Sequence, residues 1–233
     1  TRKQKKVVVT GAGGFIGHHL ARYLKKKGYW VRGVDIEKPR FSPMSDFDEF
    51  KLLDLRDPKK ALKAMEGMEW VFALAAQNGS IEFTTTVKAM IMKDNTLINV
   101  NTAEAARQAG VKRLFFSSSA CVYPLNLQGK KPTPLKESHA YPPDPDSEYG
   151  WEKLYAERLY KAYEEDHGLE VRIARFFNIY GPECLIDTLR SKAPMALTRK
   201  VVEAKDGDEV KIWGDGKAVR SFLYIDDCVE GIL

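Results

Sequence analysis

Three polar side chains in the middle of the sequence have the types and spacing needed to move a proton together with a hydride. Tyr149 and Lys153 stand at positions i and i+4 of the run YGWEK, so on a helix they would share one face. An ammonium group beside a phenol favours the phenolate, and we expect Lys153 to lower the pKa of Tyr149 so that it can accept a proton from a substrate hydroxyl. Ser119 ends a run of three serines and could hydrogen-bond the same oxygen.

A second chemical signal lies near the N-terminus, where an apolar run leads into the sequence TGAGGFIG. Its glycines allow a tight turn, the approach of a pyrophosphate to the backbone, and close packing of a helix on a strand. The first amides and the dipole of that helix can hold the phosphates of a dinucleotide. The predicted contacts are Gly11, Gly13, Gly14, Phe15, Ile16 and Gly17.

Residues at the ends of the following strands would complete the dinucleotide site. Asp35 ends the second strand, where a carboxylate can bind the ribose hydroxyls and repel a 2′-phosphate, which favours NAD over NADP. Asp54, which we place at the end of the third strand, could reach the adenine amino group or cap the following loop. The remaining predicted contacts are the small residues after the fourth strand and the helical pair: Leu74, Ala75, Ala76, Tyr149 and Lys153.

The elements that carry these residues alternate along the chain. We predict strands at 7–10, 30–35, 50–54, 70–74, 114–117 and 171–176. Helices are predicted at 14–27, 58–65, 87–109 and 148–166. This alternation predicts an α/β fold, a Rossmann-like doubly wound parallel sheet with helices on both faces. The C-terminal ends of the strands, where the polar residues lie, then share one edge.

The regular alternation is interrupted twice. Residues 124–147 contain repeated prolines and are expected to form a rigid loop over the C-terminal edge of the sheet. After Tyr180 we predict strands at 209–213 and 220–224, separated by a turn at 214–216, and then a helix opening at Asp226. We therefore expect two domains, with residues 1–180 forming an NAD-binding Rossmann domain. Residues 181–233 would be the beginning of a second, smaller lobe that is truncated in this sequence.

Composition narrows the possible partners. The chain has 233 residues, a formal charge of +5 and 44% hydrophobic residues, which is typical of a soluble globular protein. Its basic residues are scattered, so we expect no nucleic-acid partner, and no apolar run is long enough to span a membrane. Cys121, Cys184 and Cys228 are far apart, and no histidine or cysteine pair has the spacing of a metal site. We expect reduced thiols, no metal and a cytoplasmic location.

Together these motifs resemble the extended short-chain dehydrogenase/reductase family, which acts on nucleotide sugars. The resemblance extends over essentially the whole chain and includes RFFNIYGP at 175–182 and RSF at 220–222. It implies that Ser119 is the active-site hydroxyl, Tyr149 the acid/base and Lys153 its partner. It also implies that Asn178 and Arg220 bind the nucleotide diphosphate.

Cys121 narrows the reaction that the resemblance implies. The family's 4-epimerases usually have Thr or an acid here, and its 4,6-dehydratases have an Asp-Glu pair. A cysteine, with Lys192 as its opposing partner, is similar to the GDP-mannose 3,5-epimerase branch. There a thiol and an ammonium exchange protons on opposite faces of a transient 4-keto sugar. We therefore expect an NAD-dependent nucleotide-sugar epimerase, an isomerase, in which Ser119 and Lys192 also contact a GDP-hexose.

Two other interpretations remain open. The chain could be a 4-epimerase of a UDP- or GDP-sugar in which Cys121 is a spectator. It could also be a non-catalytic NAD-binding sensor, although the intact set of Ser119, Tyr149 and Lys153 argues against this. We expect a homodimer, with the helix at 87–109 either in a dimer bundle or packed on the sheet.

Overall fold

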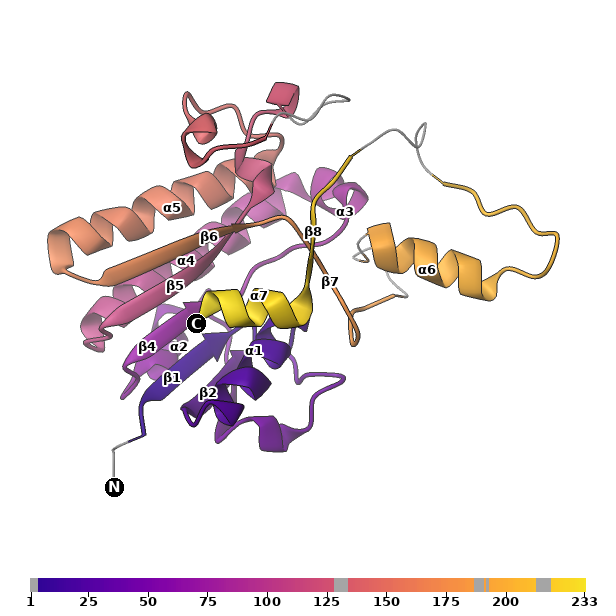
Figure 1. Ribbon diagram of the computed structural model, residues 1–233. Coiled ribbons are helices and arrows are strands. Elements are labelled where there is room, and N and C mark those ends of the chain that lie inside the picture. Colours follow the sequence, from indigo (N-terminus) through magenta and orange to yellow (C-terminus); the bar gives the residue numbers. More distant parts are fainter. Residues whose placement is uncertain (1–3, 128–133, 187–190, 192, 213–218) are drawn as a thin grey trace.

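The architecture is a parallel sheet between two layers of helices (Figure 1). The computed structural model describes residues 4–127, 134–186, 191, 193–212 and 219–233. All ladders of the six-stranded sheet are parallel, and its order is β3-β2-β1-β4-β5-β6. These strands are β1 (Lys6–Thr10), β2 (Trp30–Asp35), β3 (Glu49–Leu52), β4 (Trp70–Ala73), β5 (Arg113–Ser119) and β6 (Glu170–Phe176).

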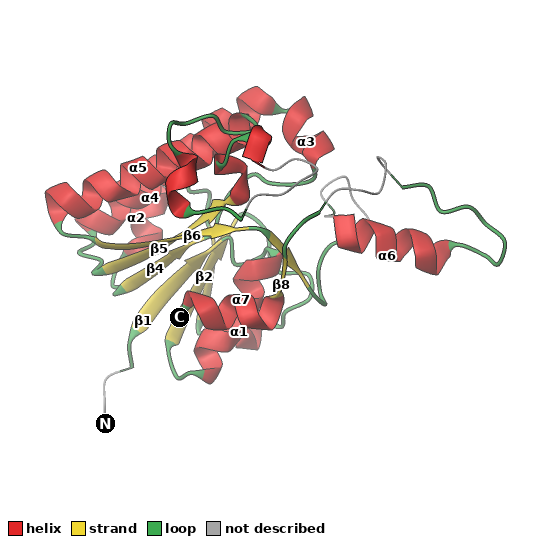
Figure 2. Cartoon of the chain, turned by 45° about the horizontal axis from the view of Figure 1, so that its top comes forward, coloured by secondary structure: helices red, strands yellow, loops and turns green. Residues whose placement is uncertain are grey.

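Helices cover both faces of this sheet, which confirms the predicted α/β class (Figure 2). One face carries α1 (Phe15–Lys26) and α7 (Ile225–Ile232), and the other carries α2 (Pro58–Met65), α4 (Lys88–Gln108) and α5 (Glu148–His167). Side chains alternate across a strand, so Val8 packs in the core beneath α2, α4 and α5, whereas Val7 and Val9 pack in the core beneath α1. Apolar residues on both faces of β1 therefore hold the two helical layers together.

The ends of the long helices follow local rules. Asp57 caps α2 by accepting the amides of Lys59 and Lys60, and Pro58 occupies the first turn. Ser147 caps α5 through the amide of Gly150, and Gly168 ends the helix in the left-handed region at φ 70°. The Ser147 cap fixes where α5 begins, and α5 carries Tyr149 and Lys153.

Several elements differ from the prediction. No helix was predicted at α3 (Ile81–Thr86) or α6 (Ala193–Glu203), and β3 ends at Leu52, before Asp54. A second, two-stranded sheet pairs β7 (Asn178–Tyr180) with β8 (Phe222–Tyr224). Among the described residues no strand is left to pair with residues 209–212, so the predicted strand at 209–213 is wrong for that part. Trp213 and the predicted turn at 214–216 lie outside the described residues. Single-turn helices lie at Met44–Asp46, Ala120–Val122, Leu125–Leu127 and Glu137–Ala140.

The last helix returns to the first. Ile225 and Cys228 of α7 are buried in the same core as Leu20 and Leu24 of α1, so the end of the chain packs on the first βα unit. Within the described part of the chain, no helix is both long and apolar enough to cross a membrane.

Candidate active site

The glycine-rich turn between β1 and α1 is shaped for a dinucleotide. Gly11 has φ +69°, a conformation that a side chain would strain. A Cβ atom on Gly17 would lie 2.0 Å from the Gly11 carbonyl oxygen, so only glycine lets α1 approach the strand this closely. Gly14 caps α1 without any side-chain hydrogen bond, and the first turn contains no acidic residue. The start of α1 thus has neither a side-chain cap nor an acidic residue in its first turn, which suits an anion such as a phosphate.

Asp35 organises this turn from the end of β2. Its Oδ2 accepts the Gly13 amide at 2.8 Å, while Oδ1 accepts the amides of Ile36 at 2.6 Å and Glu37 at 3.2 Å. Burial raises the pKa of Asp35, and these three hydrogen bonds act against the rise. The carboxylate therefore fixes the glycine-rich turn.

We expect Asp35→Asn to weaken NAD binding about tenfold. Both carboxylate oxygens of Asp35 accept backbone amides, whereas asparagine has a single acceptor oxygen, so its NH₂ group would point at a backbone N–H that it cannot bind. Loss of the charge should also reduce discrimination against NADP. Titration calorimetry with both dinucleotides measures both effects. Asp57→Asn is the matched control, since a single oxygen of Asp57 accepts both of its amides and an asparagine can keep them. An unchanged NAD affinity in Asp35→Asn would contradict this role.

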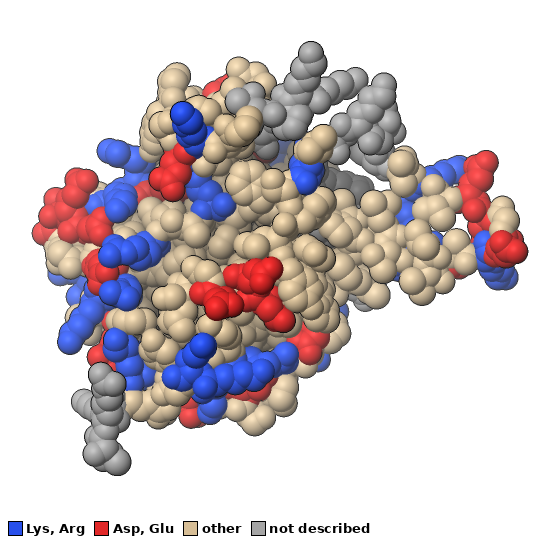
Figure 3. Space-filling model, viewed as in Figure 1, with Lys and Arg blue, Asp and Glu red and all other residues tan. Residues whose placement is uncertain are grey.

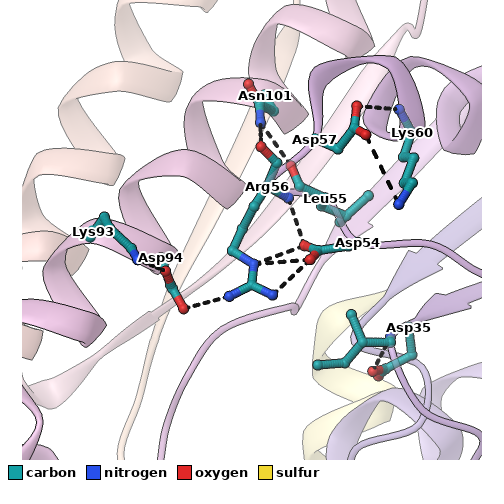
Figure 4. A network of polar contacts seen from close by, with 10 residues as sticks. Asp35, Asp54, Leu55, Arg56, Asp57, Lys60, Lys93, Asp94 and Asn101 are labelled. Carbon is teal, nitrogen blue, oxygen red and sulfur yellow. Dashed lines mark hydrogen bonds and ion pairs between the residues drawn. The ribbon is translucent and has the colours of Figure 1, made fainter.

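Asp54 belongs to a polar network in the loop after β3 (Figure 4). Arg56 donates to it from its amide at 3.0 Å and from its guanidinium at 2.7–3.1 Å, and these hydrogen bonds lower the pKa of Asp54. The same guanidinium donates to Asp94 of α4 at 2.7 Å, and Asn101 holds the carbonyls of Leu55 and Arg56. Asp54 thus caps its own loop, as one of the two alternatives predicted, and Arg56 ties that loop to α4.

The segment after β4 is held close to the glycine-rich turn. The Thr10 hydroxyl accepts the amides of Leu74 at 3.1 Å and Ala75 at 3.2 Å. A Cβ atom on Gly11 would lie 2.9 Å from the Ala75 nitrogen, so the two segments touch through backbone. Farther along, Asn95 of α4 binds both the amide and the carbonyl of Gln77. The backbone that follows Leu74, Ala75 and Ala76 therefore has a fixed path along the sheet edge.

The predicted catalytic residues meet at the end of β5. The Lys153 ammonium donates to the Ser117 carbonyl at 3.0 Å and lies 5.6 Å from the centre of the Tyr149 ring. The Ser119 hydroxyl accepts the Cys121 amide at 3.2 Å. Tyr149 and Lys153 are only 7% and 2% exposed. The structure thus brings Ser119, Cys121, Tyr149 and Lys153 to one edge of the sheet, beside the glycine-rich turn.

The predicted lowering of the Tyr149 pKa is wrong for the protein without bound cofactor. Burial raises the pKa of Tyr149 well above its ordinary value, and Cys121, Glu152 and Asp146 raise it further. Burial also lowers the pKa of Lys153, against the influence of Glu152, Cys121 and Glu157. Desolvation outweighs the attraction between phenolate and ammonium because both groups lie inside the protein. The effects of Cys121 on both groups place its thiol near them.

Sequence analysis missed two buried carboxylates beside this site. Glu152 is fully buried and accepts a hydrogen bond from Asn99 of α4 at 2.6 Å, while the Tyr160 hydroxyl donates to the same asparagine at 3.0 Å. Asn99 therefore packs α4 against α5 within one chain. Glu157 receives two hydrogen bonds from Arg175 of β6, at 2.9 and 2.7 Å. The spacing Lys153-x-x-x-Glu157 was the signal that could have revealed the second carboxylate.

The residues assigned to substrate lie at the start of the small second sheet. The Asn178 side chain donates to the Ser221 carbonyl at 3.0 Å, which brings Asn178 next to the exposed Arg220. Lys192, predicted as the opposing acid/base, lies outside the described residues. Its neighbour Ser191 is buried and donates to the Leu185 carbonyl at 3.0 Å.

Two histidines that had no predicted role form a cluster with Glu183. His18 and His19 lie on α1, and their Nε2 atoms are 3.0 and 3.5 Å from the Glu183 carboxylate. The Arg22 guanidinium also forms an ion pair with this carboxylate at 3.1 Å, so the negative charge of Glu183 is already paired with a positive side chain. Burial lowers the pKa of both histidines. The cluster joins α1 to the chain after β7. Figure 3 shows an acidic patch over α7 and, next to it, a basic patch over α1.

Comparison with known families matches residues 7–233 to the family described as NAD dependent epimerase/dehydratase. The chain belongs to this family. Its cofactor is therefore NAD.

Relatives and solved structures agree with this membership. GDP-mannose 3,5-epimerase of Arabidopsis thaliana is 47% identical over 230 residues, which are 98% of this chain and 60% of that protein. GDP-mannose 3,5-epimerase 1 of Oryza sativa subsp. japonica is 46% identical, with the same coverage of 98% and 60%. The chain thus spans 60% of the length of these relatives. The UDP-glucose 4-epimerase of Thermotoga maritima, solved with UDP-glucose, matches at a TM-score of 0.83 and 28% identity, over 97% of this chain and 72% of that one.

Proposed function

We propose that the protein epimerises a nucleotide sugar through a transient 4-keto intermediate, with GDP-mannose as the substrate. The observation that carries the proposal is the position of Cys121, whose amide is bound by Ser119 and whose thiol influences both Tyr149 and Lys153. A residue that takes no part in the reaction would not need an acidic proton at this position, whereas a thiol has one. The identity of 47% to GDP-mannose 3,5-epimerase supports the choice of sugar.

Each residue of the site can be assigned one role in the transfer of the hydride or of a proton. Bound NAD supplies the acceptor that takes a hydride from C4 and later returns it. Tyr149 takes the proton of the C4 hydroxyl, while Ser119 hydrogen-bonds the same oxygen and Lys153 stabilises the phenolate. The ketone acidifies the hydrogens on C3 and C5, and inversion requires one proton carrier on each face of the ring. We assign the Cys121 thiol to one face and Lys192 to the other.

Deuterium incorporation tests this proposal. Incubating the protein with NAD and GDP-mannose in deuterated water should place deuterium at C3 or C5, and mass spectrometry of the sugar measures it. Cys121→Ala should reduce the incorporation at least about 100-fold, because the proton carrier on one face is lost. Cys184→Ala is the matched control and should keep the rate of the parent. Absence of deuterium with the parent protein would remove the proposal.

A 4-epimerase of a UDP- or GDP-sugar is the second candidate, favoured by the TM-score of 0.83 to a UDP-glucose 4-epimerase. Such an enzyme moves only the hydride at C4 and exchanges no carbon-bound hydrogen with water. Inversion at C4 without deuterium, together with a Cys121→Ser variant that keeps its turnover, would select this reaction.

We also propose the domain organisation, the oligomeric state and the location of the protein. Residues 1–180 would form the NAD domain and residues 181–233 part of a lobe that holds the sugar nucleotide, supported by the nearness of Asn178 and Arg220. A homodimer through α4 and α5 would cover the exposed apolar side chains Met92, Leu97, Trp151 and Tyr155. All three cysteines lie in the described part of the chain and form no disulfide, which is consistent with a reducing cytoplasm.

A further inference from the structure

The segment just before α5 passes directly beside Cys121. The Asp146 amide donates to the Cys121 carbonyl at 3.2 Å. On the next turn of the chain, a Cβ atom on Gly150 would lie 2.1 Å from the same carbonyl oxygen, so only glycine allows this contact. Pro124 and Pro145 form an antiparallel bridge that closes the loop between them. The backbone of Cys121 is therefore clamped to residues 145–150, and the distance between Cys121 and Asp146 is fixed by the fold.

The side chains of these two residues are also joined. The Cys121 thiol is hydrogen-bonded to the Asp146 carboxylate, and the Ser147 hydroxyl donates to Oδ1 of that carboxylate at 2.6 Å. Ser147 is itself held as the cap of α5, where it accepts the Gly150 amide at 3.3 Å. A thiol that donates to a carboxylate has its proton directed at that carboxylate. This is the arrangement of a proton carrier paired with its own base.

The environment of Asp146 suits a proton acceptor. The side chain is half-buried, and burial raises the pKa of Asp146 while the hydrogen bonds from Ser147 and Cys121 act against the rise. A more basic carboxylate is a better acceptor of the thiol proton. Tyr149 lies close enough for both Asp146 and Cys121 to raise its pKa, and Cys121 also influences Lys153. Glu152 acts on both Tyr149 and Lys153, and Glu157 acts on Lys153.

We propose that Asp146 is the base that takes the Cys121 proton, so that the sulfur acts as the base toward the sugar ring. This inference rests on the proposed 3,5-epimerisation. The S–H proton passes to a carboxylate oxygen of Asp146, and the sulfur takes the ring proton and forms a new S–H bond. The electron pair of the broken C–H bond enters the C4 carbonyl as an enolate. The amine on the opposite face protonates the ring carbon, and water carries the proton of Asp146 back to that amine. Asp146 does not touch the sugar and is a positioning residue.

The first test measures the thiol without substrate. Asp146→Asn removes a negative charge beside the sulfur, so the midpoint of the curve of Cys121 alkylation rate against pH should move down by about one pH unit. Iodoacetamide is the probe, and mass spectrometry of the peptide that contains Cys121 separates it from the other cysteines. Asp146→Glu keeps the negative charge and should leave the midpoint close to that of the parent, whereas a disturbed fold that exposed the sulfur would lower the midpoint in both variants. An unmoved midpoint in Asp146→Asn would overturn the proposal whatever reaction the protein catalyses.

The second test measures proton transfer. In deuterated water with GDP-mannose, at a pH below the thiol midpoint of both proteins, Asp146→Asn should lower deuterium incorporation about 100-fold, because the thiol is still protonated there and an amide cannot take its proton. Asp146→Glu should recover part of the rate, and Asp144→Asn, two residues away and exposed, should match the parent in both tests. Incorporation by Asp146→Asn at the rate of the parent would overturn the role of Asp146. A parent protein that incorporates no deuterium but shows the shifted midpoint would remove the proposed reaction and leave the thiol and carboxylate paired.

Discussion

Replacing Tyr149 by phenylalanine is expected to lower the turnover of the nucleotide sugar about 10³-fold while NAD still binds. The ring of Tyr149 is buried at the end of β5, so phenylalanine can fill the same space and only the hydroxyl is lost. Without it, no group takes the proton of the C4 alcohol, and the ketone on which every later proton transfer depends does not form.

The measurement is the absorbance of reduced nicotinamide and the deuterium content of the sugar, each followed after mixing with GDP-mannose. Tyr155→Phe is the matched control, because Tyr155 lies on the same helix with 46% of its surface exposed. Turnover of Tyr149→Phe close to that of the parent would show that another group handles the C4 proton.

The same pair predicts the pH dependence of turnover. Lys153 acts in its charged form, and burial lowers its pKa, so that form is fully present at low pH and is lost as pH rises through a value below that of an exposed lysine. The alkaline limb of kcat/KM should therefore lie below pH 10.5, the ordinary value for lysine. Lys153→Arg should move this limb upward, since arginine stays charged.

Replacing Arg175 by methionine is expected to destabilise the protein by about 3–5 kcal/mol. Its guanidinium and the Glu157 carboxylate are 14% and 8% exposed and are joined at 2.7 Å. The guanidinium also donates to the Tyr123 hydroxyl at 3.2 Å and to the Glu137 carbonyl at 2.7 Å. Methionine would leave the carboxylate buried without its cation and would release the loop that covers the end of β5.

Urea unfolding followed by circular dichroism measures this loss. Arg172→Met is the matched control on the same strand: its partner Glu170 lies at 2.6 Å, but 61% of the Arg172 side chain is exposed, and the change should stay within about 1 kcal/mol. The double variant Arg175→Met with Glu157→Met should recover most of the stability, because no buried charge is then left alone. Equal losses in Arg172→Met and Arg175→Met would contradict the importance of burial.

Much of the geometry around the glycine-rich turn could be predicted because it is local. Gly11, Gly14 and Gly17 lie within one turn, and Asp35 ends the neighbouring strand, so strand order alone brings them together. Tyr149 and Lys153 are likewise neighbours on a single helix. Their shifted pKa values were not predictable in direction, because desolvation depends on how deeply the whole fold buries them.

The pairs formed across the fold were not visible in the sequence. Asp146 and Cys121 are separated in sequence by a proline-rich loop but are joined through their backbones. Glu157 of α5 binds Arg175 of β6. Glu183 binds His18, which lies 165 residues earlier in the sequence. None of these distances has a period that a helix or strand would impose. A proline-rich loop also gives no sign of where it returns to the sheet.

The sequence by itself determined the fold class, NAD as the cofactor, and the local grouping of the glycines and of Tyr149 with Lys153, because period, turn chemistry and spacing act over a few residues. Only the tertiary structure decided which buried charges are paired, in which direction the pKa values of Tyr149 and Lys153 move, and that a carboxylate lies against the Cys121 thiol. Those properties depend on the solvent that packing excludes and on contacts between segments that are far apart in the chain.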